Sequence, residues 1–247
     1  MKNLICGMVI LIIMGACSSN KSKETEAETE ETSTAEAKPE WKVLFDGSNL
    51  DNWRGYNSDE MYSNWSIEED GSMKFTPDED GGKNIVTKDE YTNFKLSLEW
   101  KISEGGNSGI FWSVYEDSTY NEAYQTGPEI QVLDNERHPD AQANPKFHQA
   151  GALYDLVQPS SDVCKQAGEW NKCVIMVDHI NNEGWVELND TRIVEFEPHG
   201  EQWDSLVAGS KFADWEGFGK YRTGKIGLQD HDDIVWYRDI KIMELAE

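Results

Sequence analysis

Residues 107–155 read NSGIFWSVYEDSTYNEAYQTGPEIQVLDNERHPDAQANPKFHQAGALYD, and this stretch decides how the chain is interpreted. It holds an apolar and aromatic segment over 109–115, a polar loop, and a second segment over 128–134. Because side chains alternate along a strand, we expect the apolar residues of this second segment on one face and Glu129 and Gln131 on the other. Residues two apart on a strand lie roughly 6.5–7 Å from each other, so Glu129 and Gln131 can meet one sugar-sized ligand.

Polar and ionisable side chains follow this second segment closely. Asp134 closes it, and Arg137, His138 and His148 come in the loop beyond. With Glu129 they place two carboxylates and two imidazoles within twenty residues of sequence. Carboxylates and imidazoles are common proton-transfer groups in enzymes, so this cluster indicates a site rather than a solvated edge.

Strand patterns dominate the rest of the chain. Residues 94–102 alternate between apolar and polar side chains, which is typical of a half-buried antiparallel strand. Many short strands separated by turn residues favour an all-β sandwich or barrel, and the lack of alternating strands and helices disfavours a parallel α/β fold. The predicted hairpins are 65–67 with 73–75, 170–180 with 185–189, and 225–229 with 234–243; a further strand is predicted over 191–196 and a helix over 202–212.

The first residues have the pattern of an export signal. Lys2 precedes an apolar run over 4–14, and small residues lead to Cys17. The run is shorter than the about 20 residues that a membrane-spanning helix needs. This segment resembles a bacterial lipobox, which implies that 1–16 is a lipoprotein signal peptide, that Cys17 carries lipid, and that Ser18 directs the protein to the outer membrane. An uncleaved anchor or plain secretion is the alternative.

Residues 17–40 are predicted to form a disordered acidic tether before a folded domain over 41–247. Residues 18–40 contain no Val, Leu, Ile, Met or aromatic residue, so nothing there offsets the entropy of ordering. The whole chain has a net charge of −25. So acidic a protein repels phosphate backbones, which argues against nucleic acid as a partner and suits an exported domain that acts on neutral small molecules and meets the membrane only through the lipid.

Four cysteines are present. Cys6 leaves with the signal and Cys17 is the lipid site, so Cys164 and Cys173 remain in the folded domain. In an oxidising compartment such a pair predicts a disulfide, and two reduced thiols are the alternative.

Ten tryptophans and nine tyrosines make the chain rich in aromatic side chains. Trp65, Trp100 and Trp170 lie in or at the edge of predicted strands and are expected in the core. Trp112 and Tyr124 flank the polar stretch, where a ring can stack on the apolar C–H face of a sugar. Aromatic rings beside carboxylates and amides therefore favour a carbohydrate site.

Six short motifs follow one another along the chain: Phe45-Asp46-Gly47 with Leu50 and Trp53, then residues 107–111, 127–134, 148–155, 168–171 and 224–231. Together they resemble the DUF1080 family, also called the 3-keto-disaccharide hydrolase family. The resemblance runs from about Trp41 to Glu244. Each motif is weak alone, and the six in order are specific.

This resemblance implies a concanavalin A-like β-sandwich, that is, an antiparallel jelly roll, and cleavage of glycosides whose glucose carries a ketone at C3. It also implies an exported or lipid-anchored protein. Two turns depart from the family pattern, at Asn189-Asp190 and at Asp232, where the family often has Gly. Asn and Asp tolerate positive φ next best after Gly, so both departures are interpreted as structural drift.

Three functions fit these observations. In the first, a base removes the C2 proton beside the ketone, the enolate expels the C1 substituent, and water adds back. The second is an ordinary jelly-roll glycosidase, which needs two carboxylates about 5–5.5 Å apart for retention. Gln131 argues against this function, because it occupies a position at which such strands carry an acid. The third is a non-catalytic carbohydrate-binding module or lectin, since a fold does not fix a function.

For the first function, Glu129, Asp134 and His148 are the catalytic candidates. A divalent metal held by some of Glu129, Asp134, His148 and His231 would also stabilise an enolate, although their spacing matches no standard zinc motif. His179 is expected to be exposed at a hairpin. The candidates for substrate binding are Asn107, Trp112, Tyr124, Gln131, Arg137, His138, Tyr154, Asp155, Gln229 and His231.

Overall fold

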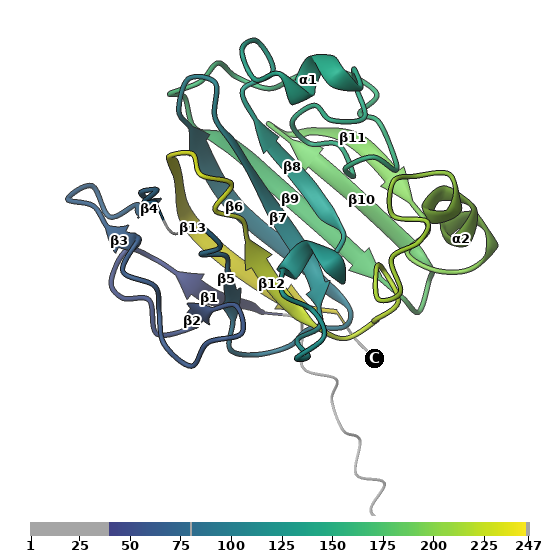
Figure 1. Ribbon diagram of the computed structural model, residues 1–247, viewed down its shortest axis with the longest axis horizontal. Helices are drawn as coiled ribbons and strands as arrows, with labels where there is room; N and C mark the ends of the chain where they lie inside the picture. Colours follow the sequence, from purple (N-terminus) through teal and green to yellow (C-terminus); the bar gives the residue numbers. More distant parts are fainter. Residues whose placement is uncertain (1–39, 80, 246–247) are drawn as a thin grey trace, which may run out of the picture. The chain divides into compact units, whose positions relative to one another are not determined.

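Two antiparallel sheets make up the computed structural model, which describes residues 40–79 and 81–245 (Figure 1). The larger sheet contains β1 (Trp41–Phe45), β3 (Trp65–Ile67), β4 (Met73–Phe75), β6 (Phe94–Ile102), β9 (Asn171–Asp178), β10 (Glu183–Leu188), β11 (Thr191–Phe196) and β13 (Val235–Glu244). The smaller contains β2 (Trp53–Gly55), β5 (Ile85–Thr87), β7 (Asn107–Val114), β8 (Glu129–Leu133) and β12 (Lys225–Leu228). The strand orders are β11-β10-β9-β6-β13-β4-β3, with β1 beside β13, and β2-β5-β12-β7-β8.

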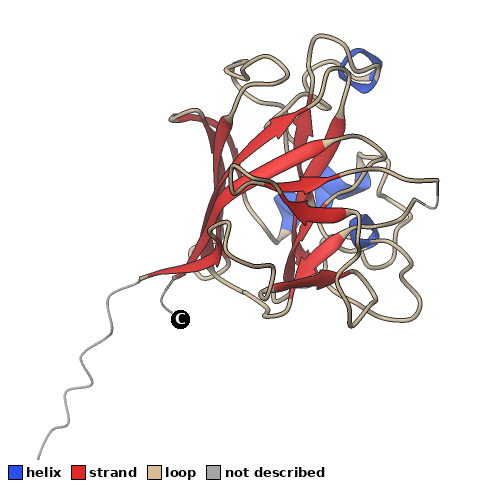
Figure 2. Ribbon diagram, turned by 90° about the vertical axis from the view of Figure 1, so that its left-hand side faces the viewer, coloured by secondary structure: helices blue, strands red, loops and turns tan. Residues whose placement is uncertain are grey.

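The main hydrophobic core contains residues from both sheets, whose strands form two layers in Figure 2. Strand β6 shows why: its alternate residues Phe94, Leu96, Leu98, Trp100 and Ile102 are each at most 2% exposed and belong to that core. The polar residues between them turn the other way, as the period of two requires. The predicted all-β sandwich of jelly-roll type is therefore confirmed.

The register between β7 and β8 places one set of paired residues in the core and the other set on the outer face of the sheet. Ile110 lies opposite Ile130, and both are fully buried in the main core. Gly109 lies opposite Gln131, on the other face of the sheet. The predicted alternation along β8 is confirmed, and Glu129 shares the outer face with Gln131.

Two of the three predicted hairpins are present. Strand β3 pairs with β4, and β9 pairs with β10. The third prediction is wrong, because β12 pairs with β5 and β7 whereas β13 belongs to the other sheet. The chain crosses between the sheets at Asp230–Asp233: the backbone N–H of Asp230 donates to Asn84 and that of Asn107 donates to the Asp233 carboxylate.

Three short helices lie outside the sheets: η1 (Ala123–Gln125), α1 (Asp140–Ala143) and α2 (Glu201–Ala208). The predicted helix over 202–212 ends too late. Gly209 caps α2, and the Ser210 hydroxyl donates to the Val207 carbonyl over 2.8 Å. Residues 211–215 are therefore released from the helix and reach the outer face of the five-stranded sheet.

Several smaller predictions can now be compared with the structure. Asn189, Asp190 and Asp232 have φ values of 49°, 63° and 56°, which supports the interpretation of both family departures as turns. His179 was expected to be exposed, but it is 6% exposed, because it packs beside Trp112 at the end of β9. Trp65 and Trp100 lie in the core. Trp170 is half-buried beneath Lys101 and Arg238.

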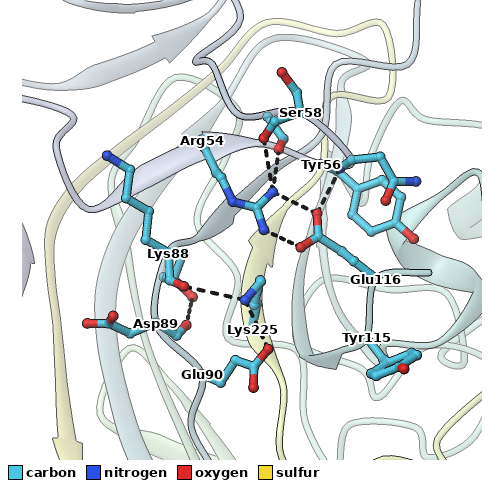
Figure 3. Close-up of polar contacts among 12 residues, drawn as sticks. Arg54, Tyr56, Ser58, Lys88, Asp89, Glu90, Tyr115, Glu116 and Lys225 are labelled. Atoms are coloured by element: carbon cyan, nitrogen blue, oxygen red, sulfur yellow. Dashed lines mark hydrogen bonds and ion pairs between the residues drawn. The ribbon is translucent and has the colours of Figure 1, made fainter. Parts of the chain in front are cut away.

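A polar cluster joins β2 to the loop after β7 (Figure 3). The Arg54 guanidinium donates to both oxygens of Glu116 and to the carbonyls of Gly55 and Ser58. The Asn57 backbone N–H also donates to Glu116, over 2.8 Å. With Arg54 and Glu116 side chains 19% and 14% exposed, this is a mostly buried ion pair with many hydrogen bonds.

The predicted disulfide is wrong, because Cys164 and Cys173 are both free thiols. Cys173 is buried in the main core on β9, opposite Leu98 and Leu188, and Cys164 lies half-buried in the loop before it. The predicted signal peptide, Cys17 and nearly all of the predicted tether lie outside the described residues. Within 40–79 and 81–245, no helix is long and apolar enough to cross a membrane.

Candidate active site

A cavity of about 360 Å³ lies on the outer face of the five-stranded sheet. Strands β7 and β8 provide its floor, α1 provides one wall, and the segment after α2 provides another. This volume is within the range of small-molecule sites. The lining residues are Asn107, Tyr124, Glu129, Gln131, Asp140, Tyr154, Lys211, Phe212, Trp215, Gln229 and His231.

Glu129 is a buried carboxylate in this cavity, 9% exposed. It lies over Gly109, where a Cβ atom would come within 2.1 Å of Oε1 of Glu129. With its amide nitrogen toward Glu129, Gln131 donates to that same oxygen over 2.8 Å and to the Ser108 carbonyl over 3.1 Å. Burial raises the pKa of Glu129 to about 8, although the positive charge of Lys211 acts to lower it. A carboxyl with this pKa can take up or release a proton near neutral pH.

A second carboxylate, Asp140, is held at the wall by two hydrogen bonds. Its Oδ1 lies 2.8 Å from Nδ1 of His148, and its Oδ2 accepts from the Tyr154 hydroxyl over 2.8 Å. The other ring nitrogen of His148 lies 3.1 Å from Oδ1 of Asp155, whose Oδ2 accepts from the Lys211 backbone N–H. His148 therefore lies behind the wall between two carboxylates and orients Asp140, rather than lining the cavity.

An ammonium group and several rings complete the wall. The Lys211 Nζ lies 4.2 Å from the centroid of the Tyr154 ring, and its positive charge acts to lower the pKa of Glu129. Burial, together with the hydrogen bond to Asp140, holds the pKa of Tyr154 far above its usual value, so its phenol stays protonated. Trp215 packs against Phe212 and Tyr124, with ring centroids 5.1 and 5.7 Å apart. These rings offer an apolar surface to a sugar.

Six of the ten predicted substrate-binding residues line the cavity. The amide of Gln229 lies in the floor: this residue is 7% exposed, and its Oε1 has no hydrogen-bond partner. Such an oxygen can accept a hydrogen bond from a bound hydroxyl. The six residues are Asn107, Tyr124, Gln131, Tyr154, Gln229 and His231.

Asp134 does not reach this cavity, and the structure corrects the prediction that it does. Its carboxylate closes a turn, where it accepts from the backbone N–H groups of Gly105 and Glu136 and from Arg137. Burial alone would raise the pKa of Asp134, but these hydrogen bonds hold it below its usual value. Arg137 is thus engaged in the turn as well. His138 accepts from the Asp140 backbone N–H, so it caps this turn rather than lining the cavity.

Two more predicted binding residues lie away from the cavity. Trp112 is 2% exposed and packs on Phe196 and Trp203 in the main core, so it offers no surface to a ligand here. Asp155 supports His148 from behind.

The four residues considered for a metal are not brought together. Asp134 is engaged in its turn and His148 between two carboxylates, while Glu129 and His231 line the cavity. In the described part of the chain, no group of three or more His, Cys, Asp or Glu residues is placed to hold a metal ion.

Four cavity residues were missed by the sequence reasoning: Asp140, Lys211, Phe212 and Trp215. Lys211 and Phe212 were missed because the helix was extended past Gly209, a frequent helix terminator that was the available signal, and Trp215 lies just beyond the predicted helix. Asp140 follows Pro139 at the start of a four-residue helix, too short to produce a periodic pattern. Its proximity to Glu129 arises from tertiary packing, which no local pattern contains.

The fold is a sandwich of the jelly-roll class, and one cavity on its outer face combines aromatic rings, amides and a buried carboxylate. The chain belongs to the family of 3-keto-alpha-glucoside-1,2-lyase-like domains, which it matches over residues 40–243. The family and its named relatives support a glycoside hydrolase-type enzyme acting on carbohydrate.

Relatives of known structure or name agree with this placement. A 3-keto-disaccharide hydrolase of Bacteroides thetaiotaomicron is 38% identical over 231 residues, which cover 82% of this chain and 78% of the relative. A provisionally assigned glycosyl hydrolase of Parabacteroides distasonis is 26% identical, with a TM-score of 0.76 over 83% of this chain and 94% of that one. A Bacillus subtilis protein of galectin-like fold, 13% identical with a TM-score of 0.51 over 83% and 94% of the two chains, shares the fold alone.

Proposed function

We propose that this enzyme cleaves 3-keto-glycosides by elimination and hydration. Glu129 takes the C2 proton, the resulting enolate forms the C1–C2 double bond as the C1–oxygen bond breaks, and water then adds at C1 while a proton returns to C2. The observation that carries this proposal is the burial of Glu129, which raises its pKa to about 8. A carboxylate of such basicity suits removal of a proton beside a ketone better than an ordinary surface carboxylate does.

The other cavity residues are assigned by their chemistry. The Lys211 ammonium stabilises the enolate oxygen in this proposal, because it lies at the cavity wall and its positive charge already acts on the Glu129 carboxylate. The amides of Asn107 and Gln229 bind hydroxyls. His231, exposed at the cavity, is positioned to protonate the leaving oxygen. The name of the B. thetaiotaomicron relative supports a 3-keto-disaccharide as substrate.

An ordinary glycosidase is the second candidate, and Asp140 is the observation in its favour. Asp140 and Glu129 line one cavity, as the two carboxylates of a glycosidase do. Both Asp140 oxygens, however, are engaged by His148 and Tyr154. Its carboxylate is therefore less available as a nucleophile or acid than as part of the wall.

Proton exchange at C2 separates these mechanisms. In D₂O, a 3-keto-glucoside cleaved by the wild-type enzyme is expected to give 3-keto-glucose with deuterium at C2 beyond an enzyme-free control. Glu129→Gln is expected to fold normally and to lose turnover, whereas Asp134→Asn, outside the cavity, serves as the carboxylate control. Cleavage of an unoxidised glucoside, or product without enzyme-dependent label, would favour the glycosidase. Sugar binding without any turnover would favour a binding module.

The same proposal includes a location. The lipobox-like sequence ending at Cys17 supports export and lipid anchoring in the outer membrane. Sugars reach the cell envelope from outside, so an enzyme held there meets glycosides before uptake.

A further inference from the structure

A second cavity, of about 410 Å³, lies between α2, the end of β9 and residues 213–222. It is separate from the Glu129 cavity, and Trp215 lines both. Its walls include the rings of Trp203 and Tyr221. The volume is sufficient for a sugar unit, and the aromatic walls suit its C–H faces.

Buried polar atoms without partners concentrate beside this cavity. Among the described residues, five buried side-chain atoms lack a hydrogen-bond partner, and three of them belong to Trp112 and His179. Both ring nitrogens of His179 are in this state, although the residue is 6% exposed and lines the cavity. The Arg222 backbone lies close enough to influence the ring, without completing a hydrogen bond. Such unpartnered buried atoms destabilise a protein unless something satisfies them.

The surrounding side chains bring further hydrogen-bonding groups. The His199 ring stacks on that of His179 with centroids 5.8 Å apart, and its Nε2 lies 3.0 Å from the His179 carbonyl oxygen. Burial lowers the pKa of His179 to about 4, so its imidazole is neutral at physiological pH and has one donor and one acceptor nitrogen. This combination suits hydroxyl groups.

The charged side chains that line this cavity are mostly cationic, whereas the chain as a whole is strongly acidic. Lys220 and Arg222 line it, with Asp204 as the opposing carboxylate, whereas the whole chain carries −25. An excess of cations in such an acidic protein is a local feature that favours an anionic group. An Arg guanidinium binds a carboxylate through two parallel hydrogen bonds.

We propose that this cavity is a second sugar-binding site, specific for a sugar unit that carries a carboxylate, that is, a uronic acid. Arg222 and Lys220 bind the carboxylate, Trp215 and Tyr221 pack against the ring, and His179 and His199 bind hydroxyls. The two cavities share Trp215, but this proposal does not rest on the reaction proposed for the catalytic cavity.

Calorimetric titration with glucuronate tests this site, with glucose as the neutral counterpart. Wild-type protein is expected to bind glucuronate about tenfold more tightly than glucose, the effect of one charge-assisted contact. Arg222→Gln, an exposed position, is expected to remove that preference and leave glucose binding unchanged. Arg192→Gln, which removes an exposed cation from β11, is the surface control, and Lys211→Gln is the control for the catalytic cavity; both are expected to retain the preference.

His179→Leu gives a second readout. It is expected to weaken binding of both sugars without lowering the melting temperature, because it removes two unpartnered nitrogens from the interior. The proposal is overturned if glucuronate does not bind, if glucose binds equally well, or if Lys211→Gln rather than Arg222→Gln abolishes the preference. A large fall in the melting temperature of His179→Leu with intact sugar binding would also contradict it, since the histidine would then be purely structural.

Discussion

The Glu129 carboxylate occupies space that is free only because residue 109 is glycine. Any Cβ at that position would lie 2.1 Å from Oε1, far inside contact distance. Gln131 fixes the same oxygen by donating a hydrogen bond. The position of the acid thus depends on Gln131, two residues further along β8, and on Gly109 of the neighbouring strand β7.

Gly109→Ala should therefore reduce activity without unfolding the protein. The methyl group displaces the Glu129 side chain, and a misplacement of about 1 Å can cost about 100-fold in rate. Turnover of a 3-keto-glucoside and thermal unfolding measure the two effects. Gly209→Ala is the matched control, because its Cβ would make an ordinary 3.4 Å contact with Ser205. Wild-type activity in Gly109→Ala would mean that Glu129 need not stay where it is.

The pH dependence of stability offers a second test of the Glu129 environment. Its folded pKa of about 8 lies above the ordinary value of 4.5, so between these values the folded state holds a proton that the unfolded state has lost. The contribution of this group to stability is thus fully present below pH 4.5 and is lost as the pH rises through about 8. We expect the melting temperature of wild-type protein to fall across this window more steeply than that of Glu129→Gln. If the melting temperatures of both proteins fall equally across this window, the pKa of Glu129 is not raised in the folded state.

Activity should change in the opposite direction, because a base must be deprotonated to act. The value of kcat/KM is expected to rise as the pH approaches the Glu129 pKa of about 8, and to fall at higher pH, where the acid that protonates the leaving oxygen has lost its proton. A rate limited instead by an ordinary carboxylate would already be constant above about pH 6.

At the scale of elements, strands with a strict period of two were predictable and crossings between sheets were not. Residues 94–102 and the face of β8 could be read directly, because alternation determines burial. The turn at Asp230–Asp233 looked like a hairpin, because a turn sequence does not record whether the next strand joins the same sheet. Likewise Asp140 and Glu129 meet only through packing of α1 on the sheet edge. Local pattern therefore predicted most of the cavity residues, and topology brought in Asp140, Lys211, Phe212 and Trp215.

The ion pair between β2 and the loop after β7 should contribute measurably to stability. Glu116→Gln leaves the mostly buried Arg54 guanidinium without its counter-charge (Figure 3). Breaking a fully buried pair costs about 3–5 kcal/mol, and partial exposure reduces this to about 2 kcal/mol. We expect the melting temperature to fall by roughly 4–8 °C. Asp190→Asn breaks the exposed pair with Lys172 and should leave the melting temperature almost unchanged; equal losses in both variants would contradict this account.

For the molecule as a whole, attachment to the cell envelope is the remaining prediction from the sequence. Lipid on Cys17 would fix the protein to a membrane through a chain that has no Val, Leu, Ile, Met or aromatic residue to insert over 18–40. Cys17→Ser is expected to release the protein into the soluble fraction or to block processing of its signal, as judged by fractionation and intact mass. Unchanged partitioning of Cys17→Ser into membranes would rule out the lipid anchor.

Strand β8 has a consequence for how such an enzyme can diversify. Its five residues Glu129–Leu133 carry Ile130 and Val132 in the core and Glu129 and Gln131 in the cavity. A deletion or insertion of one residue upstream in this strand would exchange the two sets, placing a carboxylate between the sheets and isoleucine at the substrate. Point substitutions on the cavity side leave the core untouched. Substrate preference can therefore drift one residue at a time, while the length of the strand must stay constant.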